Sequence, residues 1–286
     1  MKISQIITAD KPSLSFEVFP PKSDDKFESV RRAADEIAAL HPSYMSVTYG
    51  AGGGTSQYTG RIAAHLQDEY HVPALAHLSC VSSTRAQIRS QLDELRAAGI
   101  ENILALRGDM PQGMTCPEDY HYANELIDEI RDYGGFCIGA ACYPEGHPQS
   151  ETSFSDIAYL KQKVKSGCEF LTTQMFFDNN ILYNFLYRIR EAGIRVPVVA
   201  GIMPVTNPKQ IRRICAISGT ALPQRFLRIV ERYGDRPAAM RQAGVAYAME
   251  QIIDLYANGI NAVHVYSMNN PDVARTIQSG LSEILR

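Results

Sequence analysis

The chain has 286 residues, of which 45% are hydrophobic and 21% charged, with a net charge of -3 and a pI of about 6.2. This length supports one large α/β domain or two smaller ones. No basic patch indicates nucleic-acid binding, and no apolar run approaches the ~18 residues of a membrane span. The first eight residues are too short and too polar for a signal peptide.

The six cysteines form no CxxC pair, so neither a zinc site nor a redox dithiol is indicated. Several lie in apolar, strand-like segments, where a free cysteine behaves as a small hydrophobic residue. We therefore expect a reduced, cytoplasmic protein that binds no metal.

Short β-rich runs alternate with helical stretches from one end of the chain to the other. Near-continuous apolar strands about 30 residues apart are typical of a parallel sheet covered by helices on both faces. The helices show apolar residues at the 3.6-residue period, with examples at 27–40, 84–98, 118–132, 156–166 and 238–257. The eight strand candidates are 14–19, 44–48, 74–78, 103–107, 137–142, 170–174, 198–202 and 262–266.

A small repeat supports this alternation. Ala98-Gly99-Ile100, Ala192-Gly193-Ile194 and Asn258-Gly259-Ile260 each follow a helix and precede a strand, which suits glycine in a left-handed helix cap. Eight such units predict a (β/α)8 TIM barrel that forms a single domain over 1–286. The long connection between strands 7 and 8 has room for an extra helical segment near 226–233. A doubly wound open sheet is the structural alternative.

A glutamate lies inside the first apolar strand, Ser15-Phe16-Glu17-Val18-Phe19, and Pro20-Pro21 ends that strand. A carboxylate is costly to bury unless it is paired or protonated. Apolar surroundings raise the pKa of a carboxyl group and keep an acid ready to donate a proton near neutral pH. The plain structural interpretation is a salt-bridged glutamate at the end of a strand.

Polar residues follow every predicted strand. Because the active site of a TIM barrel lies at the C-terminal ends of its strands, we expect these side chains to meet at one mouth. The glycine-rich segment 50–55 matches no nucleotide-binding fingerprint, and we interpret it as a flexible loop. Lys161, Lys163 and Lys165 indicate a solvated helix face, or a partner for cofactor phosphates. The residues at the strand ends are Glu17, Thr48, Tyr49, His77, Arg107, Asp109, Tyr143, His147, Gln174, Asn207, Tyr266 and Asn269.

These motifs resemble the catalytic domain of the flavin-dependent, bacterial type of methylenetetrahydrofolate reductase. The resemblance covers about 15–269 and implies a (β/α)8 barrel that binds FAD. It also implies reduction of 5,10-methylenetetrahydrofolate to 5-methyltetrahydrofolate with NADH or NADPH in a ping-pong reaction, with NADH favoured. The motifs that carry it are Ser15–Pro21, Ser46–Gly50, Ala76–Cys80, Leu104–Asp109, Tyr143–Pro148, Thr173–Asp178 and Gly201–Pro204.

The resemblance also implies site residues. Glu17 would be the general acid, and Asp109 would lie between flavin and folate. Gln174, Gln210 and Asn270, together with Glu17 and Asp109, would bind substrate, although Asn270 and Ile214 stand where some relatives have an arginine and an aromatic residue. The flavin positions are Thr48, Tyr49, Ala51, His77, Arg107, Gly108, Asp109, Ala123, Tyr143, His147, Asp156, Tyr159, Gln162 and Lys163.

Two other functions stay open at this point. One is a flavin- or folate-binding barrel that serves as a subunit of a larger electron-transfer complex. The other is a proline dehydrogenase-like flavin barrel. A buried acid at Glu17 favours a complete enzyme, since a binding subunit needs no proton donor. The resemblance further implies a homo-oligomer.

Overall fold

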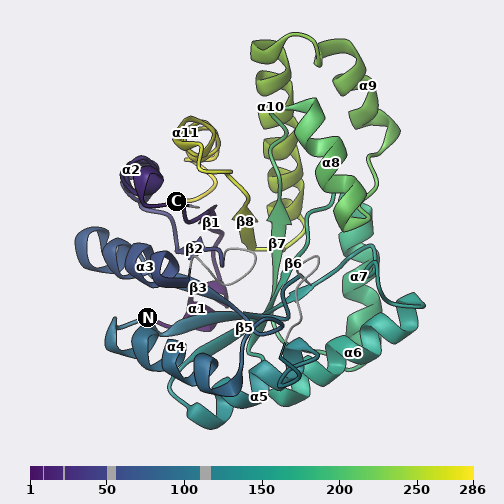
Figure 1. The fold of residues 1–286 in the computed structure, drawn as a ribbon. Coiled ribbons are helices and arrows are strands. Elements are labelled where there is room, and N and C mark those ends of the chain that lie inside the picture. The colour runs from purple at the N-terminus through teal and green to yellow at the C-terminus, as the bar shows by residue number, and fades with distance from the viewer. Residues whose placement is uncertain (9, 22, 50–55, 110–116) are drawn as a thin grey trace.

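A computed structural model describes residues 1–8, 10–21, 23–49, 56–109 and 117–286. Their eight strands form one closed barrel in which every neighbouring pair is parallel, so the predicted (β/α)8 barrel is confirmed (Figure 1). Each observed strand lies within about one residue of its predicted range. The strands are β1 Ser13–Val18, β2 Met45–Val47, β3 Ala74–Ser79, β4 Asn102–Leu106, β5 Cys137–Cys142, β6 Phe170–Thr173, β7 Val198–Ile202 and β8 Ala262–Val265.

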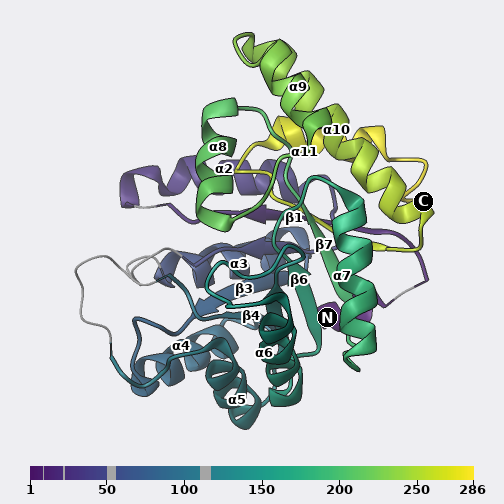
Figure 2. The same cartoon turned by 90° about the vertical axis from the view of Figure 1, so that its right-hand side faces the viewer.

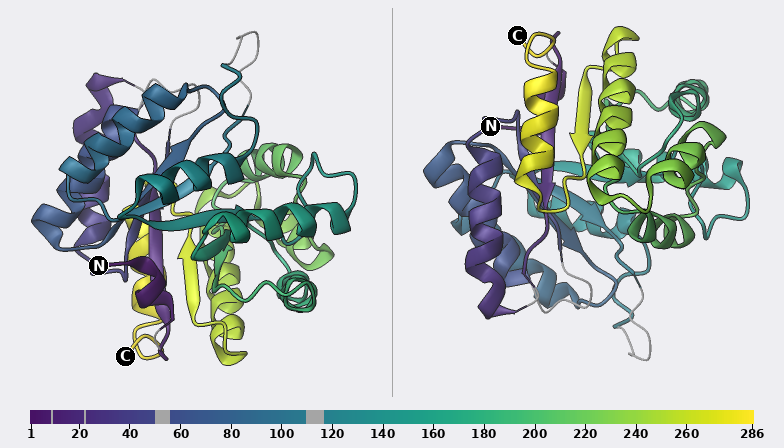
Figure 3. Two further views of the ribbon diagram at one scale, coloured as in Figure 1. Left: turned by 90° about the horizontal axis from the view of Figure 1, so that it is seen from below. Right: turned by 90° about the horizontal axis from the view of Figure 1, so that it is seen from above.

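Helices surround this barrel. Figure 3 shows it from two opposite directions, with α11 beside α2 and with α5 beside α6. The described helices are α1 Ile3–Ile7, α2 Phe27–Ala38, α3 Ser56–Tyr70, α4 Arg85–Ala97, α5 Ala123–Tyr133, α6 Ser153–Ser166, α7 Asn179–Glu191, α8 Pro208–Ser218, α9 Gln224–Tyr233, α10 Pro237–Ala257 and α11 Pro271–Gly280, with a 3-10 turn, η1, at Asp24–Lys26.

Capping residues correct two of the predicted helix starts. The helix predicted from residue 118 begins at Ala123, because the Glu125 carboxylate accepts hydrogen bonds from the backbone N–H groups of His121 and Tyr122. The helix predicted from residue 156 begins at Ser153, because the Thr152 hydroxyl accepts from the N–H of Ser155. Both starts follow from satisfying N–H groups that have no partner within the helix.

The connection from β7 to β8 contains more structure than was predicted. The expected helix near 226–233 is confirmed as α9, and α8 precedes it. Figures 1 and 2 show α8 and α9 on the outer side of the barrel near α10. Phe226 of α9 stacks on Phe177, with ring centroids 5.4 Å apart, and packs against Tyr247 of α10. This separate aromatic cluster anchors the connection to the end of β6.

The barrel interior is apolar at its N-terminal end and becomes polar towards the mouth. At the N-terminal end, Ile3 and Ile7 of α1 pack into an apolar cluster with Leu75, Phe170 and Val199. On β1, Leu14, Phe16 and Val18 face the helices, whereas Ser13, Ser15 and Glu17 alternate with them. The inner face of β1 is therefore polar up to the mouth of the barrel.

Strand register brings specific residues together across the barrel wall. Ser15 of β1 pairs with His264 of β8, and Glu17 pairs with Ser46 of β2. His264 also lies opposite Gly201 of β7. Close packing needs glycine at that position, because a Cβ atom there would clash with the carbonyl oxygen of Thr173 and the hydroxyl of Tyr266.

We predict that Gly201→Ala destabilises the protein by about 1–3 kcal/mol, as overpacking does where the obstructing atom is backbone. The matched control is Gly60→Ala in α3, where the new Cβ would be 3.8 Å from Leu95 Cδ2. Alanine is the better helix former, so the control should be neutral or stabilising. The free energy of unfolding from urea titration checks both. Equal values for Gly201→Ala and the native chain would contradict this account of the interior.

Candidate active site

The described residues place Glu17 at the C-terminal end of β1, where the barrel opens. Its side chain is buried, with 5% relative exposure, and Glu17 is the register partner of Ser46 on β2. Burial raises the pKa of Glu17 to about 8. The carboxyl group is therefore mostly protonated at neutral pH, as a proton donor requires.

His77 of β3 lies beside this acid, with Nε2 3.7 Å from the Glu17 carboxylate oxygen. Burial lowers the pKa of His77 to about 3, so the imidazole is neutral at the pH where Glu17 is protonated. The two groups therefore form a neutral pair and not an ion pair. Within the described residues, His77 Nε2 is buried without a hydrogen-bond partner, which suits a polar atom brought by a ligand.

A cavity of about 440 Å³ opens at the same mouth, between the ends of β4 and β5 and the helices α5 and α6. This volume lies in the range of small-molecule sites, about 300–1,000 Å³. Eleven of the fourteen residues expected to contact flavin line it: Tyr49, Arg107, Gly108, Asp109, Ala123, Tyr143, His147, Asp156, Tyr159, Gln162 and Lys163.

Two cations, Arg107 and Lys163, line this cavity together with the carboxylates of Asp109 and Asp156. Arg107 follows β4 and donates to the side-chain oxygen of Gln149 over 2.7 Å, and Lys163 of α6 donates to the carbonyl oxygen of Ala141 over 3.0 Å. Neither forms an ion pair with a carboxylate in the part of the chain that the structure describes. Burial lowers the pKa of Lys163, so a bound anion would stabilise its charged form. Lys163, the lysine that the resemblance selected as a flavin position, therefore lines the cavity.

Aromatic and backbone groups complete the walls. The rings of Tyr143 and His147 meet edge to face, with centroids 4.5 Å apart. Asp156 accepts a hydrogen bond from Ser150 and leaves a carboxylate edge in the lining. Gly108 has φ of 85°, and a Cβ there would be 3.0 Å from the Ser79 Cβ. Only glycine lets the backbone turn at this place beside the cavity.

The remaining expected residues lie elsewhere. Thr48 is buried at the end of β2, and Ala51, with the glycine-rich segment 50–55, lies outside the described residues. Gln174 follows β6, where its side-chain oxygen accepts from the Met175 N–H over 3.2 Å. Gln210 is exposed on α8. Asn270 caps α11 by accepting from the Val273 N–H, so its side chain already has a structural role.

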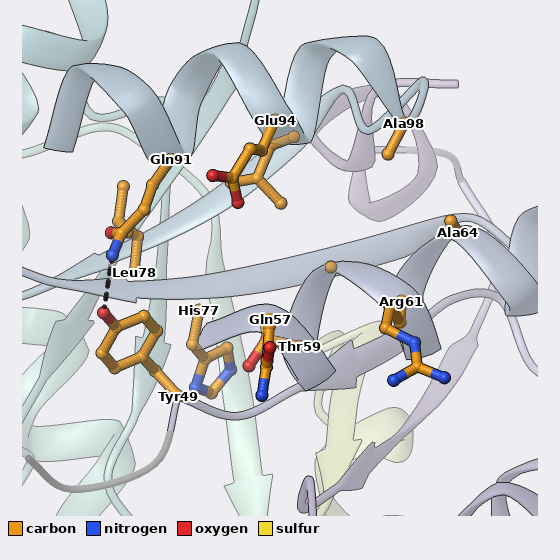
Figure 4. A pocket seen from close by; sticks show the side chains of 12 residues that line it. Tyr49, Gln57, Thr59, Arg61, Ala64, His77, Leu78, Gln91, Glu94 and Ala98 are labelled. Carbon is orange, nitrogen blue, oxygen red and sulfur yellow. Dashed lines mark hydrogen bonds between the residues drawn. The ribbon is translucent and has the colours of Figure 1, made fainter. Parts of the chain in front are cut away.

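A second cavity, of about 350 Å³, lies between α3 and α4 (Figure 4). Tyr49 lines both cavities, and its hydroxyl accepts a hydrogen bond from Gln91 over 3.0 Å. Gln57, Arg61 and Glu94 add polar groups around largely apolar walls. Tyr49 therefore forms the boundary between the mouth of the barrel and this lateral space.

Sequence reasoning missed several residues of the site. Tyr122 and Gln149 line the cavity, and Ser46 and His264 lie beneath Glu17. Residues two apart on a strand point to the same side. Ser46 precedes Thr48 by two positions and His264 precedes Tyr266 by two, so the sequence could have marked both as inward-facing. Their contacts depend on register between strands, which a single sequence does not show.

The lining fits FAD, an elongated dianion with an aromatic end. Arg107 and Lys163 supply unpaired positive charge for a diphosphate, and Asp156 can accept from a ribose hydroxyl. Gly108 lets a planar ring approach the backbone closely. No set of three or more His, Cys, Asp or Glu side chains suited to a metal ion occurs in the described ranges. No helix in those ranges is long and apolar enough to cross a membrane.

The chain belongs to the methylenetetrahydrofolate reductase family, whose family model matches residues 2–282. It is 31% identical to 5,10-methylenetetrahydrofolate reductase of Escherichia coli over 265 residues, covering 93% of this chain and 89% of the relative. It is 34% identical to methylenetetrahydrofolate reductase (NADH) 1 of Arabidopsis thaliana, covering 94% of this chain but 48% of that relative. The chain thus spans about half the length of its plant relatives.

Solved structures with low sequence identity share the fold. An uncharacterized protein from Clostridium thermocellum, described as binding two copies of 5-methyl-5,6,7,8-tetrahydrofolic acid, aligns with a TM-score of 0.70 at 12% identity. The alignment covers 98% of this chain and 99% of that protein. Dihydropteroate synthase from Xanthomonas albilineans aligns with a TM-score of 0.54 at 14% identity, covering 96% and 93%. These likenesses concern the barrel alone.

The buried acid makes a prediction about stability against pH. The pKa of Glu17 is about 8 in the folded state and near 4.5 in the unfolded chain, so its stabilising contribution is lost as pH rises between these values. His77 and His264 have folded pKa values of about 3 and act in the opposite direction. Their contribution to folding stability is lost as pH falls below about 6.5. Between pH 6.5 and 8 the Glu17 effect should dominate, at up to about 1.4 kcal/mol per pH unit.

Glu17→Gln should abolish this fall in stability between pH 6.5 and 8, because glutamine does not titrate. Urea titrations of both proteins at several pH values measure the difference. A native chain whose stability relative to the variant stays flat over this window would show that Glu17 is ionised at neutral pH.

Proposed function

We propose that this protein reduces 5,10-methylenetetrahydrofolate to 5-methyltetrahydrofolate with NADH or NADPH, using FAD. The observation that carries the proposal is the pairing of a neutral buried acid, Glu17, with a cation-lined cavity at the same barrel mouth. Membership of the methylenetetrahydrofolate reductase family supports it.

Glu17 acts as the general acid. The methylene bridge of the folate has to open to an N5-iminium cation before it can accept a hydride, and opening needs a proton at the leaving nitrogen. A carboxyl group that stays protonated near neutral pH can supply that proton. Such a donor typically contributes ~10²–10⁴ in rate.

Asp109 and Gln174 orient and stabilise the folate. Asp109 follows β4 at the exposed edge of the cavity, so its negative charge favours the developing iminium cation. Gln174 follows β6, and we assign its amide to the pterin and, in turn, to the nicotinamide amide. Gln210 and Asn270 would add contacts farther out, which Asn270 can do only if it leaves its capping position.

The cofactor lies in the 440 Å³ cavity in this proposal. Arg107 and Lys163 hold the diphosphate, Asp156 and His147 contact the ribityl and ribose portions, and Tyr49, Ala123, Tyr143, Tyr159 and Gln162 complete the walls. Thr48, Ala51 and His77 are assigned to the flavin ring by resemblance to the family. When bound, FAD supplies a hydride carrier that both substrates use in turn, which gives ping-pong kinetics.

We further infer a single barrel domain over 1–286, a homo-oligomeric state and a cytoplasmic location. The five cysteines among the described residues are all free, which is consistent with a reducing compartment. NADH is the favoured donor, since the plant relatives carry that donor in their names.

Anaerobic mixing of purified protein with NADH, followed by methylenetetrahydrofolate, tests the proposal. The expected trace is bleaching of the flavin absorbance by NADH and its recovery on adding folate. A protein that carries no flavin overturns the proposal. A flavin that only a partner protein can reduce supports an electron-transfer subunit, and one reoxidised by other acceptors but not by folate supports a different flavin enzyme.

Glu17→Gln should separate the two half-reactions. Reduction of the flavin by NADH should stay near the native rate, because that step needs no proton from Glu17. Reoxidation by methylenetetrahydrofolate should slow by roughly 10²–10⁴. Stopped-flow absorbance measures both rates in one preparation, and equal losses in both steps would remove Glu17 as the acid.

Lys163→Met should weaken FAD binding roughly tenfold or more, the scale of one charged hydrogen bond. Lys165→Met on the same helix is the control, since Lys165 is exposed and does not line the cavity. Titration of apoprotein with FAD, followed by flavin fluorescence, gives both dissociation constants. Similar constants for the two variants would place the diphosphate away from Lys163.

A further inference from the structure

Beneath Glu17 the described residues form a continuous line of polar contacts inside the barrel. The Ser46 hydroxyl oxygen is 2.9 Å from His264 Nε2, and the Ser15 hydroxyl oxygen is 2.8 Å from His264 Nδ1. Ser15 Oγ also lies 3.0 Å from the carbonyl oxygen of Val263. Ser15, Ser46 and His264 are at most 2% exposed, so no bulk water competes for these bonds.

The positions of the hydrogen atoms follow from counting donors. The carbonyl of Val263 can only accept, so its contact with Ser15 is a hydrogen bond only if Ser15 donates to it. Ser15 then has only lone pairs to offer His264, and Nδ1 must carry the imidazole proton. Neutral His264 therefore presents a lone pair at Nε2, and Ser46 donates its single hydrogen there.

The opposite arrangement makes fewer bonds. With the proton on Nε2, His264 would donate to Ser46, Ser46 would donate to Glu17, and Ser15 would turn to Nδ1. Val263 would then lose the Ser15 hydroxyl, and the carboxyl proton of Glu17 would have no acceptor at Ser46. His77, whose Nε2 lies 3.7 Å from the carboxylate oxygen, is neutral and so provides no cation that would favour an ionised Glu17.

We propose that His264 is a positioning residue whose Nδ1–H form, fixed by Ser15, commits the Ser46 hydroxyl to His264 and leaves Ser46 Oγ to accept the carboxyl proton of Glu17. The inference rests on the proposed role of Glu17 as the acid. It adds to burial a hydrogen-bond acceptor for the carboxyl proton, which a substrate nitrogen would replace.

Two tyrosines hold the imidazole in this orientation. Tyr44 stacks on His264 at 5.6 Å with an interplanar angle of 3°, and Tyr266 meets it edge-on at 5.6 Å and 88°. The Tyr266 hydroxyl is anchored by donating to the Thr173 carbonyl over 2.6 Å. Rotation that exchanged the ring nitrogen and carbon positions would therefore disturb packed neighbours on two sides.

The groups facing Glu17 keep its titration isolated. His77 and His264 have pKa values lowered to about 3 by burial, while burial raises the pKa of Tyr44 and Tyr266 well above neutrality. Ser46, the register partner of Glu17, does not titrate. A protonation event between pH 5 and 9 at this point of the barrel therefore belongs to Glu17.

The direction in which Ser46→Ala shifts the pKa of Glu17 distinguishes a Ser46 that accepts from Glu17 from one that donates to it. A Ser46 hydroxyl that donated to Glu17 would stabilise the carboxylate, so its removal would raise the pKa of Glu17. In the proposed arrangement Ser46 accepts from the acid form, and Ser46→Ala should lower that pKa by about one unit, the order of one buried hydrogen bond. Ser13→Ala is the matched control, since Ser13 is on the same face of β1 and bonds Asn261 instead.

The experiment uses full-length protein with ¹³C-labelled glutamate carboxyl groups and ¹⁵N-labelled histidine. Carbon NMR titration gives the pKa of Glu17, assigned by Glu17→Gln, in the native chain, Ser46→Ala and Ser13→Ala. Nitrogen NMR gives the His264 tautomer, assigned by His264→Asn. We expect Nδ1–H on His264, a lowered pKa in Ser46→Ala and no shift in Ser13→Ala.

A proton on Nε2, or a pKa that rises or stays unchanged in Ser46→Ala, would overturn the inference whatever the activity. A protein with the expected tautomer and shift but without folate reduction would instead overturn the proposed function alone. The pH profile of the folate half-reaction in Ser46→Ala should move in the same direction as the NMR pKa. A purely structural loss would lower the rate equally at every pH.

Discussion

The burial of one carboxyl group without a cationic partner is the constraint on which the site depends. Closing eight parallel strands removes sheet edges and dries the interior, so a glutamate that faces inward near the mouth cannot be solvated as an ion. Glu17 meets this constraint by staying neutral. The same low dielectric that makes the carboxylate costly makes the protonated group a useful acid at neutral pH.

The mouth of the barrel separates two kinds of chemistry. Among the described residues, His77, His264, Tyr44 and Tyr266 near Glu17 are neutral at about pH 7, so desolvation and hydrogen bonds control the proton. Across the cavity, Arg107 and Lys163 offer positive charge with no carboxylate partner among the described residues. If either cation lay beside Glu17, it would stabilise the carboxylate and remove the acid. The two cations lie on β4 and α6, away from β1, so the carboxyl group and the positive charges stay apart at the same end of the barrel.

Much of this architecture was predictable because its signals are local. Apolar runs of strand length gave all eight strands, and the glycine after a helix, as at Gly99, marked the turn into the next one. The position of Glu17 at the mouth followed from its strand and from Pro20-Pro21. Helix starts were less certain because Glu125 and Thr152 cap α5 and α6 through side-chain bonds that composition does not reveal.

What the sequence could not supply was contact between strands. Ser15, Ser46 and His264 look unremarkable in their own segments, and an inward-facing histidine in an apolar strand is most often a satisfied core residue. Parallel register places His264 beside Ser15, and Ser46 beside Glu17, although the pairs are separated by 249 and 29 positions along the chain. The pattern of its helix alone did not distinguish Lys163 from the exposed lysines beside it. The resemblance selected it, and the fold turns its side chain to the Ala141 carbonyl.

The direction of a hydrogen bond therefore matters as much as its presence in this barrel. Ser46 touches Glu17 in either arrangement, yet it stabilises the acid when it accepts and the conjugate base when it donates. A serine does not by itself fix whether it donates or accepts, because its hydroxyl rotates to suit its surroundings. The direction is set by the Val263 carbonyl of β8, which can only accept a hydrogen bond. It therefore fixes the direction of the Ser15 hydroxyl, and Ser15 in turn fixes the position of the proton on His264. In this way the backbone ladder of the barrel fixes the direction of the hydrogen bond offered to Glu17, while burial raises the pKa of this carboxyl group.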